Sequence, residues 1–266
     1  MPPENQHTNE MLLDEESAFI GAYLTWARPV AFGTTMAHTG FRGHADIENW
    51  RLLPTLCRRI SKVHLLKQWE GEIIESFKSQ YGLDNWSDIN VLAYARHHGA
   101  PTRLLDWSRN PLVALWFSVS DATFDNSDGA VYRLNSIESN DVVCPATNFE
   151  LAYADECKCG RPVHMFTSPK AIERSERQHS IFTITTFRDS LATIPVDNLV
   201  HNSNSIKIKR FDVASPLKAK IRQFLSNVGL DPYSIYGDPD SFGEKLRNIY
   251  SVENLQKPIT HRWKRT

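Results

Sequence analysis

The chain has 266 residues, of which 41% are hydrophobic, and its 30 basic and 31 acidic residues leave a formal net charge of −1. This apolar content is enough for a sizeable core, which excludes a globally disordered chain. The near-neutral balance gives no overall field towards nucleic acid or an anionic membrane, although it leaves room for a local basic groove.

The sequence favours a protein of a reducing compartment that does not span a membrane. No run approaches the roughly 18 consecutive apolar residues of a membrane span. Residues 1–16 are polar and acidic, without the basic start and apolar centre of a signal peptide. Four cysteines do not make a disulfide framework in a chain of this size. We therefore expect a cytoplasmic protein with no membrane partner, and the sequence leaves its oligomeric state open.

Helical patterns dominate the first half of the chain. Apolar residues recur at helical spacing over 15–26. A strongly amphipathic pattern over 63–81 ends at Gly82, and a second helix is predicted over 87–98.

A short strand is predicted over 103–107, before Asn110-Pro111 begins a helix that is apolar on most faces. The pattern then changes to the alternation typical of strands, at 130–134, 163–166, 181–187 and 206–211. Helical spacing returns at 217–228 and 241–250. This order predicts an α+β fold, with a helical first half packed on a mixed, mainly antiparallel sheet.

The chain shows no internal repeat and no clear linker, so we expect a single domain over 15–254. A flexible tail is expected at 1–14, an insertion loop at 135–160 and a basic tail at 255–266.

Polar residues are concentrated in 97–111, His-His-Gly-Ala-Pro-Thr-Arg-Leu-Leu-Asp-Trp-Ser-Arg-Asn-Pro, between two helices that are expected to be buried. Polar groups in such a place must be paired or must face a cavity. One interpretation is a structural network in which Arg103 pairs with Asp106, while Asn110 caps a helix. The other is a ligand pocket with Arg42 nearby, at a helix N-terminus that favours anions such as phosphates.

Three blocks of this sequence resemble the signature of the FRG-domain family, and the resemblance covers roughly residues 38–250. The first is Phe41-Arg42-Gly43, and the second is 97–108 with Asn110-Pro111 and Ala114-Leu115-Trp116-Phe117. The third is Gln178 with Phe182, followed by a C-terminal part over 206–247 that holds the turn Tyr236-Gly237-Asp238-Pro239-Asp240. The chain departs from the family pattern at Arg96, usually Gln, and at Ser180, usually Gly.

The family's layout resembles the split sheet of the ADP-ribosyltransferase fold, and this likeness is an analogy of fold. It implies an NAD-dependent ADP-ribosyltransferase-like enzyme with a nucleotide-type ligand, NAD as cofactor and an undetermined protein or nucleic-acid acceptor. Family members occur in bacterial phage-defence and toxin settings. The resemblance implies catalytic roles for Arg42, His98, Asp106 and Gln178. It implies ligand-binding roles for Phe41, Gly43, Thr102, Arg103, Ser108 and Asn110.

Two other functions remain open. A non-catalytic ligand-sensing or protein-interaction module is one, because the neutral Gln178 can neither stabilise positive charge nor accept a proton as a glutamate does. A nuclease using His97, His98 and Asp106 for acid–base chemistry is the other. No metal is expected, because Cys157-Lys158-Cys159 has a single intervening residue, unlike the usual zinc spacing.

Overall fold

The computed structural model describes residues 4–29, 31–32, 35–36, 38–136, 163–167, 173–187, 193–201 and 206–249. Its helices are α1 (Glu4–Trp26), α2 (Thr55–Arg59), α3 (Val63–Tyr81), α4 (Asp88–His97), α5 (Pro111–Val119), α7 (Glu173–Arg177), α8 (Val196–Val200), α9 (Lys218–Asn227), α10 (Pro232–Tyr236) and α11 (Pro239–Ile249). Two short 3-10 helices are η1 (Ala122–Phe124) and η3 (Ser215–Leu217). The strands are β1 (Ala31–Phe32), β2 (Thr35–Met36), β3 (His38–His44), β4 (Leu104–Ser108), β5 (Gly129–Ser136), β6 (Val163–Thr167), β7 (Ser180–Thr185) and β8 (Ile206–Val213).

The α+β class is confirmed, and the sheet is more regular than expected. Strands β3 to β8 form one six-stranded sheet in the order β6-β7-β4-β3-β5-β8. Every described strand pair is antiparallel, so the parallel pairs that a mixed sheet would need do not occur in the described part. The two central strands, β3 and β4, come from the half of the chain that the sequence patterns marked as helical.

The sheet is weakly joined at its centre. Strand β3 pairs with β5 over seven residue pairs, from His38↔Ser136 to His44↔Ala130, but it pairs with β4 only at Phe41↔Ser108. Strand β4 in turn pairs with β7 from Leu104↔Ile184 to Ser108↔Ser180. The β3 and β4 strands therefore separate on the His44 side of Phe41, which leaves space between the two halves of the sheet.

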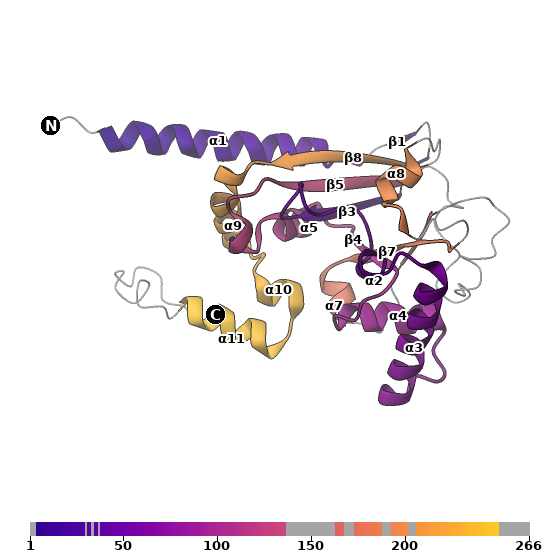
Figure 1. The fold of residues 1–266 in the computed structure, drawn as a ribbon. Helices are drawn as coiled ribbons and strands as arrows, with labels where there is room; N and C mark the ends of the chain where they lie inside the picture. Colours follow the sequence, from indigo (N-terminus) through magenta and orange to yellow (C-terminus); the bar gives the residue numbers. More distant parts are fainter. Residues whose placement is uncertain are drawn as a thin grey trace.

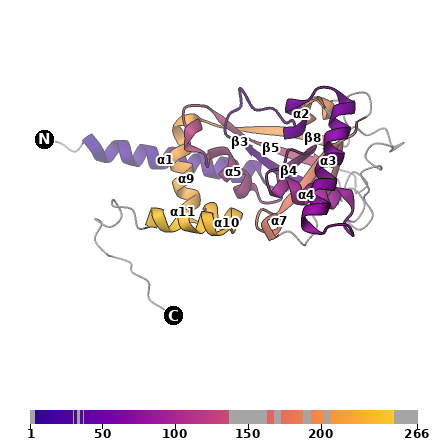
Figure 2. The same cartoon turned by 60° about the horizontal axis from the view of Figure 1, so that its bottom comes forward.

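Different helices cover the two halves (Figure 1). A hydrophobic cluster from α1, α5, α9 and α10 packs against β3, β5 and β8. A second cluster, from α3 and α4, packs against β4, β6 and β7. Figure 2 shows α9, α10 and α11 gathered at one end of the molecule and α2, α3 and α4 at the other, with α7 beside α10.

Local sequence signals account for most helix boundaries. Helix α3 spans the predicted residues, and Gly82 ends it in the left-handed conformation with φ of 64°. Helix α5 begins where Asn110 accepts a hydrogen bond from the Leu112 N–H, with Pro111 in the first turn. Ser87 occupies the N-cap of α4 but makes no side-chain capping bond. Helix α1 begins at Glu4, eleven residues before the predicted start at 15.

The predicted pairing of Arg103 with Asp106 is wrong. Arg103 is completely buried, and its Nη2 and Nε donate to Glu70 of α3 at 2.8 and 3.1 Å. Its Nη1 donates to the carbonyl of Thr185 at 2.7 Å, and its guanidinium stacks on Phe187 at 3.6 Å. Side chains alternate between the two faces along a strand, but Arg103 lies just before β4. The alternation therefore did not show whether Arg103 and Asp106 point in the same direction.

Parts of the sequence predictions lie outside the described residues. The insertion loop predicted at 135–160 begins with Asn135 and Ser136, which belong to β5, and its remainder is not among the described residues. The basic tail at 255–266 also falls outside them.

Candidate functional site

A cavity of about 690 Å³ opens where β3 and β4 separate. Its volume lies in the range typical of small-molecule sites. The described residues that line it come from all three sequence blocks and from the C-terminal part of the chain: Phe41, Arg42, Gly43, Ala45, Trp50, Arg96, His97, His98, Gly99, Asp106, Trp107, Ser108, Ala114, Phe117, Ser120, Asp121, Arg174, Gln178, Ser180 and Tyr236. The four candidate catalytic residues, Arg42, His98, Asp106 and Gln178, are therefore brought to one cavity.

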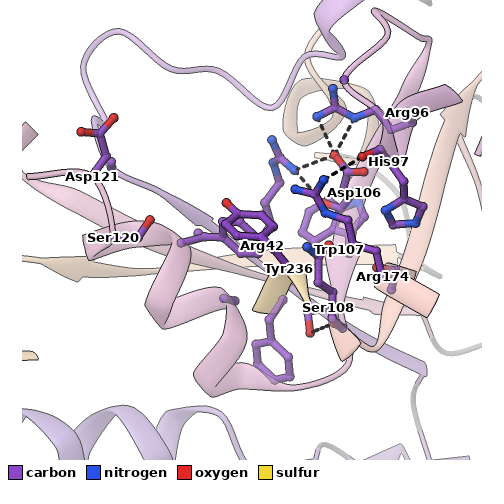
Figure 3. Close-up of a pocket in the computed structure, with 18 of the residues that line it drawn as sticks. Arg42, Arg96, His97, Asp106, Trp107, Ser108, Ser120, Asp121, Arg174 and Tyr236 are labelled. Carbon is purple, nitrogen blue, oxygen red and sulfur yellow. Dashed lines mark hydrogen bonds and ion pairs between the residues drawn. The ribbon is translucent and has the colours of Figure 1, made fainter. Parts of the chain in front are cut away.

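Arg42 spans the space between the two central strands (Figure 3). Its Nη1 donates to the backbone carbonyl of Asp106 at 2.7 Å and lies 3.6 Å from the Asp106 carboxylate. Its Nε donates to Nε2 of His44 at 3.0 Å. Among the described residues, Nη2 has no partner. One edge of the guanidinium fork is thus fixed by the protein, and the remaining nitrogen is left for a ligand.

His44 acts as a neutral acceptor for Arg42. Burial, together with the charges of Arg42 and Arg58, lowers the pKa of His44 to about 2. Because Nε2 accepts the bond from Arg42, the ring proton belongs on Nδ1. The pKa of Arg42 is lowered to about 10, mainly by burial, with Asp106 opposing the shift and Arg96 and Arg58 adding to it. Arg42 remains a cation at neutral pH.

Asp106 is held between Arg96 and Arg42. Nη2 of Arg96 lies 2.7 Å from Oδ2 of Asp106, and Nε of Arg96 donates to the same oxygen at 2.8 Å. Burial by itself would raise the pKa of Asp106, but the two arginines outweigh burial and lower it below the ordinary value of 3.8. Asp106 is therefore an ionised carboxylate whose charge is already neutralised by the protein, which does not suit it to act as a general acid.

Arg174 and Tyr236 form the wall on the side of α7 and α10. The Arg174 guanidinium lies over the Tyr236 ring, 4.3 Å from its centroid, and its Nη1 donates to the carbonyl of His97 at 2.9 Å. Tyr236 also meets Trp116 edge-on. This wall joins the C-terminal helix α10 to the end of α4 and adds a third arginine to the cavity.

The two histidines at the end of α4 differ in setting. His97 is 6% exposed and packs edge-on against Phe182, and burial lowers its pKa to about 4. His98 is exposed, lines the cavity and packs against Tyr94. No hydrogen bond joins either imidazole to Asp106 among the described contacts. An acid–base pair between a histidine and Asp106 is thus not assembled here.

Ser108 and Gln178 make structural contacts within the cavity wall. The Ser108 hydroxyl donates to the Gln178 carbonyl at 2.7 Å and accepts from the Asn110 N–H at 3.0 Å. The Gln178 side-chain amide points to the carbonyl of Ile235 of α10 at 3.5 Å, at the limit of a hydrogen bond. The left-handed backbone in this block is at His179, with φ of 50°, and Ser180 continues into β7.

Each residue of Phe41-Arg42-Gly43 has a distinct role in the structure. Phe41 is buried and meets Trp26 of α1 edge-on. A Cβ added to Gly43 would clash with the Ala114 carbonyl and lie 2.7 Å from the Ser118 nitrogen. Glycine therefore allows β3 to approach the backbone of α5, and that approach sets the position of Arg42 between them.

Three of the predicted ligand-binding residues do not line the cavity. Thr102 is fully buried, and its hydroxyl accepts from the Leu104 N–H at 3.3 Å. Arg103 is bound to Glu70, and the Asn110 side chain caps α5 at 2.9 Å from the Leu112 nitrogen. All three position the strand β4 and the helix that follows it.

The sequence predictions omitted several lining residues: Trp50, Arg96, Asp121, Arg174 and Tyr236. Arg96 carried a signal, because it replaces the glutamine usual in the family at the position beside the paired histidines. Glu70 also carried one, because it lies between Leu66 and Ile74 on the buried face of α3 and so requires a buried partner. Arg174 carried none, and Tyr236 was noted only as part of the C-terminal turn, since the proximity of these two residues depends on how α10 packs.

The described residues contain no group of three or more His, Cys, Asp or Glu side chains placed to hold a metal ion. Cys144, Cys157 and Cys159 lie outside the described residues. Cys57 is a buried free thiol, and burial raises its pKa to about 12. No described helix is both long and apolar enough to cross a bilayer.

Comparison with known proteins gives one match. No curated protein and no solved structure is significantly similar to the chain. The family model of the FRG domain matches residues 37–127, which hold β3, α2, α3, α4, β4 and α5 and so most of the elements around the cavity. The chain therefore contains a segment, residues 37–127, that matches the FRG domain.

Proposed function

We propose that the cavity between β3 and β4 binds an anionic, nucleotide-type small molecule. The observation that carries this proposal is an excess of positive charge at one end. Arg42, Arg96 and Arg174 line that end, Asp106 pairs with the first two, and the charge of Arg174 acts on Asp238, which is outside the cavity lining. Buried or half-buried cations without matching anions are unfavourable, so a bound phosphate would stabilise this arrangement.

The geometry suits a phosphate more than a simple counter-ion. Nη2 of Arg42 is unpartnered among the described residues, while its other nitrogens hold the guanidinium in a fixed orientation. A fixed, planar donor fork matches phosphate oxygens and loses little side-chain entropy on binding. Trp50, Phe117 and Tyr236 add aromatic surface to the same cavity, against which a base can pack.

Titration calorimetry of the full chain tests this function with ADP-ribose, NAD and adenosine. We expect ADP-ribose and NAD to bind, and their affinity to fall with increasing salt because the contacts are charged. Adenosine has the base and the sugar but no phosphate, so it should bind at least tenfold more weakly than ADP-ribose. Equal affinity for adenosine and ADP-ribose would contradict a site based on the arginines.

The second candidate function is transfer of the ADP-ribosyl group of NAD, and it extends the first. It is favoured by the convergence of Arg42, Asp106 and Gln178, which come from three separate sequence blocks. In such a reaction the Arg42 fork would orient the NAD pyrophosphate, and Asp106 would hold that fork in place through its backbone carbonyl and its carboxylate. The acceptor is a protein, a nucleic acid or water.

Nicotinamide release distinguishes this reaction from binding alone. We expect Gln178→Glu to keep or raise NAD turnover if Gln178 lies beside the reacting ribose, because the glutamate adds a charge that stabilises the transition state. In a site that only binds, the same change places a negative charge near an anionic ligand and weakens NAD binding several-fold without any release of nicotinamide. If the wild type and Gln178→Glu both bind NAD but neither releases nicotinamide, the transferase function is excluded and ligand sensing remains.

A role in bacterial phage defence or in a toxin system follows from the family resemblance. We propose to test it by infecting bacteria that express the wild-type chain or Arg42→Lys. A defence role predicts protection by the wild type and its loss in the variant at equal protein levels. Equal phage yields from wild-type, variant and empty-vector cells would contradict it.

A further inference from the structure

The cavity has a second polar end, formed by Ser120 and Asp121. Figure 3 shows these two residues on one side of the view and Arg96, His97 and Arg174 on the other, with Arg42 between them. Ser120 is the C-cap residue of α5, and Asp121 follows it and caps η1. Both residues line the cavity. A single ligand that fills the cavity would therefore meet arginines at one end and a carboxylate at the other.

The capping role of Asp121 occupies only one of its two carboxylate oxygens. Oδ1 accepts the N–H of Thr123 at 3.0 Å and the Thr123 hydroxyl at 2.6 Å. Oδ2 has no hydrogen-bond partner among the described residues. The bonds from Thr123 also lower the pKa of Asp121, so the carboxylate is ionised at neutral pH. One charged oxygen is therefore left as a strong acceptor at this end of the cavity.

The surrounding charges indicate what Oδ2 would accept. Arg222 and Lys218 both contribute to the lowered pKa of Asp121. Both are bound elsewhere: Arg222 pairs with Asp125 at 2.6 Å, and Lys218 donates to the carbonyls of Ala45 and Phe124 at 2.6 and 2.7 Å. These cations would repel a positively charged ligand group but not a neutral hydroxyl. The environment thus favours a hydrogen-bond donor without charge.

We propose that Asp121 accepts hydrogen bonds from the ribose hydroxyls of the bound nucleotide and so selects ribonucleotides over deoxyribonucleotides. This inference rests on the proposed nucleotide binding and adds the sugar to it. In dinucleotide sites of the Rossmann fold, an acidic side chain accepts a hydrogen bond from a ribose hydroxyl at a distance from the pyrophosphate. Asp121 is exposed, so water can replace a missing hydroxyl, and the expected discrimination is that of one charge-assisted hydrogen bond.

Calorimetric titration with ADP and with 2′,3′-dideoxy-ADP tests the inference. We expect the wild-type chain to bind ADP about tenfold more tightly than the dideoxy nucleotide. Asp121→Asn keeps an oxygen to cap η1 but replaces the second oxygen with an amide donor. It should weaken ADP binding about tenfold and leave the dideoxy affinity unchanged, so that the selectivity disappears. Asp88→Asn, an equal change of charge on the exposed N-terminus of α4 and outside the cavity lining, should behave as the wild type.

The outcomes separate this inference from the proposed function. Equal wild-type affinity for ADP and dideoxy-ADP, or unchanged selectivity in Asp121→Asn, overturns the role of Asp121 while nucleotide binding stands. Absence of binding of both nucleotides to the wild type overturns the proposed function, and the role of Asp121 with it.

Discussion

Arg96 and Asp106 form an ion pair across the space between α4 and β4, with 2.7 Å between Nη2 and Oδ2. The pair is partly buried, with side chains 21% and 29% exposed. Arg96 lines the cavity together with Arg42, so one carboxylate faces two guanidinium groups. Asp106 cannot neutralise both Arg96 and Arg42, and the surplus charge is the feature on which ligand binding depends.

Arg96→Gln tests the contribution of this extra charge. A glutamine can still donate a hydrogen bond to Asp106, so the fold should be kept, with a loss of stability of about 1 kcal/mol or less. We expect affinity for ADP-ribose to fall about tenfold by calorimetry, because a charge-assisted contact is lost. Arg210→Gln removes a surface arginine that pairs with Asp212 on β8, outside the cavity lining, and should leave affinity unchanged. Equal losses in both variants would indicate a nonspecific charge effect.

Asp106→Asn should make stability depend on pH in a defined direction. The folded-state pKa of Asp106 is lower than its ordinary value of 3.8, so the ionised group stabilises the fold above that pH. We expect the variant to be less stable than the wild type by about 1–3 kcal/mol at neutral pH. The difference should shrink as pH falls below the ordinary value and vanish near the folded-state pKa. Urea unfolding from pH 7 to pH 3 measures it, and a difference that grows on acidification would contradict the pairing.

The Arg103–Glu70 pair should contribute to the fold and not to ligand binding. Glu70→Gln leaves the fully buried Arg103 without its anion and should destabilise the chain by about 3–5 kcal/mol. Lys78→Ala breaks a pair with Asp88, whose side chain is 48% exposed, and should cost less than about 1 kcal/mol. Thermal unfolding of the two variants gives the comparison. A Glu70→Gln protein with the melting temperature of the wild type would show that Arg103 finds another anion.

Gly43→Ala should separate β3 from α5. The added methyl group meets the backbone of Ala114 and Ser118, which cannot move without shifting the helix, so we expect a loss of about 1–3 kcal/mol or more. Weaker ADP-ribose binding should accompany it, because Arg42 follows the strand. Gly71→Ala is the matched control, since this glycine lies in α3 with no atom within 4 Å of an added Cβ. That variant should be stabilised by about 0.5–1 kcal/mol. A stable Gly43→Ala protein with intact binding would disprove the close packing.

The sequence predicted the bounds of helices and strands better than it predicted which side chains pair with one another. The bounds of α3, the cap of α5 and the strand β4 follow from spacing, Gly82 and Asn110-Pro111, all of which act within a few residues. The partner of Arg103 lies 33 residues away in α3, so the nearest carboxylate in sequence was the wrong choice. Helices α7 and α10 are only five residues each, too short for a periodic signal.

The candidate site likewise contains residues that the sequence predicts and residues that it misses, for the same reasons. Arg42, Asp106 and Gln178 were predicted because each is a polar residue beside apolar strand residues in a recognisable block. Tyr236 joins the cavity because α10 packs against α7, where Arg174 stacks on its ring. Such a contact follows from the tertiary arrangement of elements with no shared sequence pattern, and it became visible only in the assembled fold.

Nucleotide binding, as proposed, depends on the arginines of this cavity holding the phosphates. A crystal structure of the full chain grown with saturating ADP-ribose tests it most directly. We expect the diphosphate within hydrogen-bond distance of Arg42 and Arg96, in the space between β3 and β4. A diphosphate bound elsewhere on the chain, or an empty cavity under conditions in which calorimetry shows binding, would contradict it.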